Sequence, residues 1–150
     1  MEFALVQDYS SAIDDVTKAV LIDEQLYFGY FCRAYWRYKL FEYKRAMGEN
    51  FDIAEIELML RDYDYIITNE PDFSFAYYNK ANMICLQRDF RSAISYYTKA
   101  IEIDNDFAEA YFNRGLTYIY INEIDKGLAD LSKAGELGIY QAYNLISRFQ

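Results

Sequence analysis

The feature that most constrains this chain is a repeat of its own sequence. Shifting the sequence by 34 residues aligns Tyr-Tyr-Asn at 77–79 with Tyr-Phe-Asn at 111–113, and Ala81 with Gly115. A period of this length is typical of repeat architectures. One unit cannot bury its apolar face alone, so neighbouring units stack and share a continuous core.

The first half of the chain matches the middle at a longer offset. Tyr30 aligns with Tyr77 and Ala34 with Ala81, which gives 77 − 30 = 47 residues. Since 47 − 34 = 13, one unit carries an insertion of 13 residues. We place the insertion around residues 39–57, between the two helices of the second unit, and expect it to lengthen both helices.

Each unit shows the apolar spacing of two amphipathic helices. Apolar residues recur at steps of three and four, and no alternating β-branched run indicates a strand. The spacing predicts helices at 9–22, 26–46, 53–69, 74–87, 90–103, 108–121, 124–136 and 139–149. Residues 1–7 are predicted to end a separate, earlier helix.

The third and fourth units resemble the tetratricopeptide repeat. This family places an aromatic early in the first helix, a small residue four positions later, and alanines flanking an aromatic in the second helix. The third unit carries Tyr77, Ala81, Ala93, Tyr97 and Ala100 at these places. The fourth carries Tyr111, Gly115, Tyr118, Gly127 and Ala134, although Leu131 replaces the second-helix aromatic.

The resemblance implies an all-α fold, a right-handed superhelical stack of helix–turn–helix repeats closed by a C-terminal capping helix. We predict a single domain over 1–150, divided into a partial repeat (1–26), a repeat with the insertion (27–73), two regular repeats (74–107 and 108–138) and the capping helix (139–150). We expect the chain to be a fragment of a longer array, with Phe3, Leu5 and Val6 poorly covered; the alternative is that a partner covers them.

Composition excludes several kinds of function. The 150 residues include 15 basic and 24 acidic residues, a net charge of −9, so nucleic acid and anionic membranes are poor partners. There is no histidine, which removes Ser-His and Cys-His catalysis and His-ligated metal sites. Two cysteines, Cys32 and Cys85, form no metal motif and suit a reducing compartment. We therefore predict no enzyme, no cofactor, no metal and a cytoplasmic location.

The insertion region has a lopsided charge. Residues 33–45 hold five bases and one acid, whereas residues 49–72 hold eight acids and one base. The favoured interpretation is that two antiparallel helices pair these charges on solvated faces. The alternative is a protruding acidic edge that binds a basic partner.

The resemblance also implies where a partner would bind. First helices of such repeats line a concave groove that takes an extended peptide or a helix. The matching positions here are aromatic or amide-bearing: Phe28, Phe31, Tyr35, Tyr38, Phe75, Tyr78, Asn79, Asn82, Leu86, Phe112, Asn113, Leu116 and Tyr120. The groove positions that hold Lys and Arg in chaperone-tail binders carry no cation, so we predict against chaperone-tail binding.

We therefore predict a non-catalytic module that binds a protein or peptide with apolar anchors in this groove. The alternative is a structural piece of a longer array that associates with a second copy as a homodimer.

Overall fold

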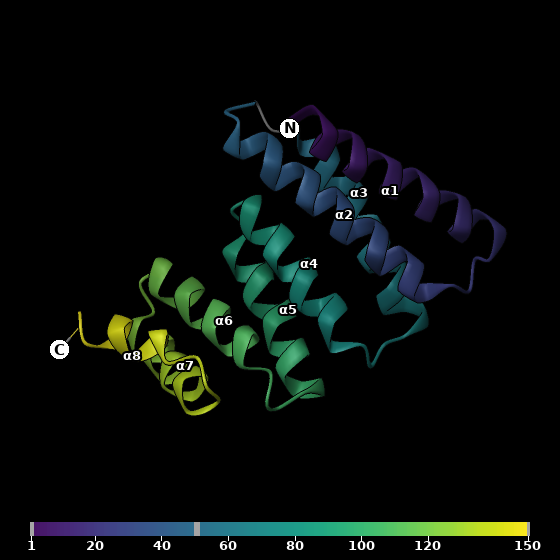
Figure 1. Cartoon of the computed structure of the whole chain (residues 1–150). Helices are drawn as coiled ribbons and strands as arrows, with labels where there is room; N and C mark the ends of the chain where they lie inside the picture. Colours follow the sequence, from purple (N-terminus) through teal and green to yellow (C-terminus); the bar gives the residue numbers. More distant parts are fainter. Residues whose placement is uncertain (1, 50–51, 150) are drawn as a thin grey trace. The chain divides into compact units, whose positions relative to one another are not determined.

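The structure, a computed structural model, describes the backbone of residues 2–49 and 52–149 and the side chains of residues 7–49 and 52–149. Within these ranges the chain forms helices and no strand (Figure 1). The helices are α1 (Glu2–Ile22), α2 (Tyr27–Ala46), α3 (Ile53–Asn69), α4 (Ser74–Leu86), α5 (Phe90–Ile103), α6 (Ala108–Tyr120), α7 (Ile124–Glu136) and α8 (Gln141–Ile146). The all-α repeat fold predicted from the sequence is confirmed.

The chain divides into two compact units, Met1–Pro71 and Asp72–Gln150, called unit 1 and unit 2 below. Unit 1 holds α1, α2 and α3, and unit 2 holds α4 to α8. The division falls beside the boundary predicted between the repeats at 27–73 and 74–107.

Two helix predictions at the ends of the chain are wrong. Helix α1 runs unbroken from Glu2 to Ile22, so residues 1–7 do not end a separate helix. The reason is local: no glycine or proline interrupts residues 2–22. The last helix covers Gln141–Ile146 rather than 139–149. The expectation for Phe3, Leu5 and Val6 lies outside the described side chains.

Four helices end in the same hydrogen-bonded turn, built around a residue with positive φ. These residues are Gly48, Arg88, Asn122 and Gly138, with φ between 65° and 108°. At Arg88, the next N–H donates to Ile84 O and its own N–H donates to Cys85 O. This is the Schellman arrangement, which satisfies carbonyls left open at a helix end.

Unit 1 packs α2 against both α1 and α3. Ala34 of α2 is fully buried, as are Ile56 and Met59 of α3, and Tyr63 is nearly so. Helices α2 and α3 have 20 and 17 residues, against 13 and 14 for α4 and α5. The predicted lengthening of both helices is therefore confirmed.

Unit 2 contains two helix pairs, α4 with α5 and α6 with α7, and α5 also packs on α6. Ala81 and Ala93 are fully buried where α4 meets α5. Gly115 and Gly127 occupy the equivalent place between α6 and α7. A Cβ added to Gly127 would lie 2.8 Å from the Gly115 carbonyl oxygen, so this crossing requires a residue without a side chain.

Helix α8 covers the apolar end of α6 and α7. Leu131, Ala134 and Ala142 form a buried cluster there, and Phe112 and Ile146 pack against it. This contact gives α8 the covering role predicted for a C-terminal cap.

Candidate protein-binding surfaces

The groove residues predicted on α4 and α6 meet through a polar network. Asn113 Nδ2 donates to Asn82 Oδ1 at 2.9 Å and to the Tyr78 hydroxyl at 3.1 Å. The hydroxyl of Tyr97, on α5, donates to the same Asn82 oxygen at 2.6 Å. The network therefore ties three helices together and fixes the orientation of both asparagine amides.

The inner end of this network is buried. Tyr97 is nearly inaccessible to solvent, and burial raises the pKa of its phenol, as it does for Tyr78. Cys85 Sγ lies 3.7 Å from both the Tyr97 hydroxyl and Thr117 Oγ1. The outer end is partly exposed at Asn82 and Asn113. Within the described part of the chain, Asn113 Oδ1 accepts no hydrogen bond.

The same two helices carry aromatic and aliphatic side chains near these positions in the sequence. Phe75 and Tyr78 both pack on Phe107, with ring centroids 4.9 Å and 4.8 Å apart. Phe75 and Leu116 nevertheless stay exposed. Asn79 turns back to its own helix, where its Nδ2 donates to Phe75 O at 2.8 Å. We call the set Phe75, Tyr78, Asn82, Asn113 and Leu116 the α4/α6 surface.

Three other predicted groove residues of unit 2 lie apart from this network. Phe112 packs on the cluster under α8. Tyr120 is 63% exposed but its ring rests on Phe90, at the start of α5, with centroids 4.4 Å apart. Leu86 is half-buried at the last position of α4.

The predicted residues of unit 1 lie along α2. Phe28 is 67% exposed and stacks on Phe31, which is half-buried and also meets Tyr63 edge-on. Tyr35 is exposed with its ring against Trp36, and Tyr38 stacks on Phe41. Each of these rings thus has an aromatic neighbour within unit 1.

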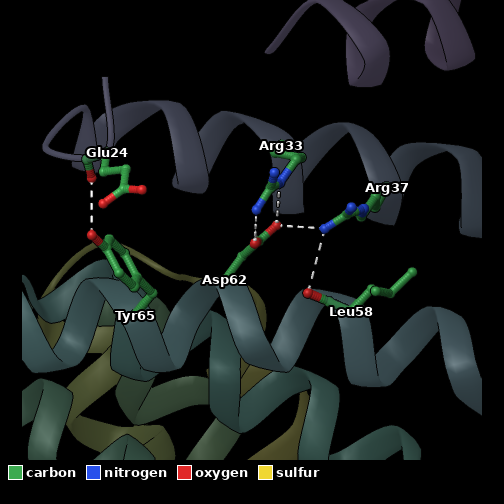
Figure 2. A network of polar contacts seen from close by, with 6 residues as sticks. All are labelled: Glu24, Arg33, Arg37, Leu58, Asp62 and Tyr65. Atoms are coloured by element: carbon green, nitrogen blue, oxygen red, sulfur yellow. Dashed lines mark hydrogen bonds and ion pairs between the residues drawn. The ribbon is translucent and has the colours of Figure 1, made fainter. Parts of the chain in front are cut away.

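A buried ion cluster that the sequence analysis missed joins α2 to α3. Asp62 is only 2% exposed and receives two hydrogen bonds from Arg33, the Nε bond at 3.0 Å. Arg37 Nη1 donates to the same carboxylate at 2.6 Å and to Leu58 O at 3.4 Å (Figure 2). Nearby, the Tyr65 hydroxyl donates to Glu24 O at 3.0 Å.

The two arginines respond differently to this shared carboxylate. Hydrogen bonding to Asp62 raises the pKa of Arg33. Desolvation by burial lowers the pKa of Arg37, with the neighbouring charge of Arg33 acting in the same direction. One carboxylate therefore serves two guanidinium groups.

An arginine–aspartate pair equivalent to Arg33 and Asp62 also occurs in the last repeat. Arg114 Nε and Nη2 donate to the two oxygens of Asp130 at 2.7 Å and 2.8 Å. The register aligns Arg33, Lys80 and Arg114 at one position, and Asp62, Tyr96 and Asp130 at another. In the middle repeat, Lys80 Nζ lies 4.3 Å from the centre of the Tyr96 ring. This alternation of paired residue types was a sequence signal that could have revealed the cluster.

The charge pairing expected across the insertion is confirmed, since Arg33, Arg37 and Lys44 all bind acids of α3; Lys44 lies 2.6 Å from Glu55. The expectation that all these pairs lie on solvated faces is wrong for Asp62. The long arginine side chains reach inward between the helices, where a single carboxylate can accept from both.

Among the described residues, no group of three or more Cys, Asp or Glu side chains could hold a metal ion. None of the described helices combines the length and apolar character needed to cross a membrane.

Two descriptions of known protein families match the second half of the chain. The family description "TPR repeat" matches residues 81–119, and "Tetratricopeptide repeat" matches residues 108–137. Together these matches cover residues 81–137, and they confirm the predicted resemblance to the tetratricopeptide-repeat family. This fold is generally a non-enzymatic scaffold, and the repeats form a protein–protein interaction module.

Two curated relatives share part of the chain. The Hsp70-Hsp90 organizing protein of Triticum aestivum is 38% identical over 52 residues, covering 35% of this chain and 9% of that protein. The UDP-N-acetylglucosamine–peptide N-acetylglucosaminyltransferase of Giardia intestinalis is 30% identical over 67 residues, covering 45% and 4%. The chain thus matches only a small part of the length of each.

A solved structure is similar over most of the chain. It is MamA, from residue 41 to the end, from Desulfovibrio magneticus RS-1. The TM-score is 0.72 at 15% sequence identity, covering 94% of this chain and 77% of that one. At this identity the likeness shows the fold alone.

Proposed function

We propose that the α4/α6 surface binds an extended peptide or a helix that carries apolar anchors. The observation that carries this proposal is the state of Asn113. Its Nδ2 is held by Asn82 and Tyr78, so the amide is oriented, while Oδ1 accepts no hydrogen bond from the described residues. An oriented acceptor at a partly exposed position suits a backbone N–H of a partner.

The surroundings of Asn113 support apolar anchors. Phe75 lies three residues before Tyr78 on α4, and Leu116 lies three residues after Asn113 on α6; both side chains are exposed. Tyr78 is held by packing on Phe107. Rigid aromatic and aliphatic surface provides contact area at low cost in conformational entropy. The exposed rings of Phe28 and Tyr35 on α2 offer a similar surface within unit 1.

The test needs a variant that leaves the polar network intact. Asn82→Ala is unsuitable because the buried Tyr97 hydroxyl would lose its acceptor. We therefore choose Phe75→Ser with Leu116→Ser, and Tyr140→Ser as the matched control, since Tyr140 is also exposed and lies outside the surface.

The measurement is affinity capture with wild type and variants in parallel, followed by titration of the recovered partner. The proposal expects the double variant to weaken binding by about tenfold or more and the control by less than twofold. Equal binding by a folded double variant and the wild type would refute it.

Self-association is a second candidate, supported by exposed aliphatic residues near the end of α1. Leu21 and Ile22 are 75% and 88% exposed, and Leu26 and Phe28 follow. Sedimentation at increasing concentration tests this candidate. If the chain self-associates, the wild type should form a dimer and the Ile22→Lys variant should be a monomer. A wild type that stays monomeric at every concentration would rule out self-association.

The proposed location remains the cytoplasm. Cys32 and Cys85 are both free thiols, which suits a reducing compartment. The net charge of −9 supports a protein partner over nucleic acid.

A further inference from the structure

Helix α1 carries the sequence of a second repeat helix. Shifting the chain by 127 − 12 = 115 residues aligns α1 with α7, the second helix of the last repeat. Five aligned positions hold identical or similar residues: Ala12 and Gly127, Asp15 and Asp130, Val16 and Leu131, Lys18 and Lys133, and Ala19 and Ala134. Helix α7 packs against α6, the first helix of the same repeat.

The face of α1 that carries these residues is open. Helix α1 packs on α2 at one edge of unit 1 (Figure 1), and the described residues include no first helix for its own repeat. Leu131 of α7 is fully buried, whereas its counterpart Val16 is partly exposed. The Asp15 side chain is 77% exposed, against 10% for Asp130. We call Ala12, Asp15, Val16 and Ala19 the α1 face.

The contact between α6 and α7 shows what such a face accepts. A Cβ added to Gly115 of α6 would lie 3.1 Å from Asp130 Cβ and 3.2 Å from Leu131 Cγ, so the two helices meet closely here. Arg114, the residue before it, donates to both Asp130 oxygens at 2.7 Å and 2.8 Å. A covering helix therefore needs a small residue at the crossing and, directly before it, an arginine for the aspartate.

The first helices of the other repeats follow the same rule. In α2, Arg33 donates to Asp62, and the next residue, Ala34, is fully buried. In α4 the cation is Lys80, and it faces the ring of Tyr96 instead of an aspartate. A tyrosine lies three residues before the cation in all three first helices, at positions 30, 77 and 111. An aspartate on the second helix, as on α1, therefore goes with the pattern Tyr-x-x-Arg followed by Ala or Gly.

Lys18 does not replace this arginine. Its Nζ lies 3.2 Å from Asp15, but the two side chains are 72% and 77% exposed, and an exposed pair of this kind contributes little. Helix α7 has the same Asp-x-x-Lys spacing, and there the aspartate binds the α6 arginine while Lys133 lies 3.7 Å from Glu136. Asp15 is thus able to accept an arginine that a partner supplies.

We propose that the α1 face binds a helix of a partner protein that carries Tyr-x-x-Arg-Ala or Tyr-x-x-Arg-Gly. Its arginine donates to both carboxylate oxygens of Asp15, and its small residue lies over Ala12. Its tyrosine packs near Ala19, as Tyr111 packs on the cluster that contains Ala134. The partner helix takes the place that α6 has on α7, and it binds independently of the α4/α6 surface, which belongs to unit 2.

The probe is an acetylated and amidated peptide with the sequence of residues 105–123, which contains α6. Titration of the isotope-labelled full chain with this peptide, followed by backbone amide NMR, should shift the signals of the α1 face. A peptide with Arg114→Gln should bind at least about tenfold more weakly, because it loses the bidentate charged pair. A peptide with Gly115→Leu should lose at least about tenfold as well, because the crossing has no room for a large side chain.

A matched pair of variants of the full chain tests Asp15 directly. Asp15→Asn removes the acceptor charge, whereas Asp14→Asn removes the same charge from the next residue, whose side chain points in a different direction from the helix. Both aspartates are exposed, so both variants should keep the fold. We expect Asp15→Asn to weaken binding of the parent peptide about tenfold and Asp14→Asn by less than twofold.

Four results with the peptides would overturn the proposal: no shift at millimolar peptide, equal binding of the parent and Arg114→Gln peptides, equal effects of Asp14→Asn and Asp15→Asn, or shifts confined to unit 2, where the peptide would replace α6. In sedimentation, a wild-type dimer that Asp15→Asn converts to monomer would assign the α1 face to a second copy and would also overturn it. Because the α1 face belongs to unit 1, its failure leaves the proposal for the α4/α6 surface standing.

Discussion

Replacing Asp62 with alanine should destabilise unit 1 strongly. The carboxylate is 2% exposed, and the side chains of Arg33 and Arg37 are 14% and 19% exposed. The variant leaves two largely buried cations without their counter-ion. Removing one partner of a buried ion pair typically costs about 3–5 kcal/mol.

We expect the loss for Asp62→Ala to be about 3 kcal/mol, at the lower end of that range, because both guanidinium groups retain some contact with water. For a chain of this length this corresponds to a fall in Tm of about 6–12 °C. Asp130→Ala should cost less, since it strands only Arg114, which keeps a hydrogen bond to Thr98 Oγ1 at 2.9 Å.

The assay is urea unfolding followed by tryptophan fluorescence. Trp36 is the single tryptophan, and it packs in unit 1 with ring centroids 6.0 Å from Tyr9 and 5.2 Å from Tyr35. Fluorescence therefore reports unit 1, whereas far-ultraviolet circular dichroism reports helices of both units. Asp62→Ala should move the fluorescence midpoint, and Asp130→Ala chiefly the dichroism.

Glu57→Ala is the control, because Glu57 is an exposed acid of the same helix and its removal should change stability by less than about 0.5 kcal/mol. A triple variant, Arg33→Met, Arg37→Leu and Asp62→Leu, should recover much of the lost stability by replacing the charges with apolar packing. A loss below about 1 kcal/mol for Asp62→Ala would refute the reasoning.

Three further predictions concern backbone and tyrosine. Gly127→Ala should lower stability in urea unfolding despite its better helix propensity, because the new Cβ would lie 2.8 Å from the Gly115 carbonyl oxygen; a stabilised variant would contradict this. Arg88→Gly should raise stability by about 0.5–1 kcal/mol, since φ is 65° there, and an unchanged midpoint would count against it. Burial raises the pKa of Tyr63 and Tyr97, so both favour the neutral phenol in the folded state. Their contribution to stability is complete below about pH 10 and is lost at higher pH, where the tyrosines of the unfolded chain ionise. Absorbance at 295 nm should show that Tyr63 and Tyr97 ionise only when the chain unfolds. Ionisation of either phenol in the folded chain near pH 10 would refute this prediction.

The helix pattern could be predicted closely because it depends on local periodicity. The sequence analysis placed α3, α5 and α7 at the residues where the structure has them. It failed at the start of the chain, where it divided the continuous helix α1. The repeat register implied a break there, but the local sequence contains no residue that ends a helix.

The candidate surfaces could be predicted only in part. The register identified Asn82 and Asn113 as members of one face, yet it could not show that they bond to each other across 31 residues of sequence. It also grouped Phe112 with them, although Phe112 packs under α8. Neighbours contributed by other helices decide these outcomes, and repeat position alone does not specify them.

The sequence by itself determined the repeat period, the helical class and the positions of small and aromatic core residues, because each follows from spacing along the chain. Only the tertiary structure decided which long polar side chains meet. Arg33 and Asp62 are 29 residues apart, and their bond depends on how α2 and α3 pack. The pocket lined by Ile13, Arg37, Leu40, Glu55 and Leu58 also depends on the tertiary structure, because these residues come from α1, α2 and α3.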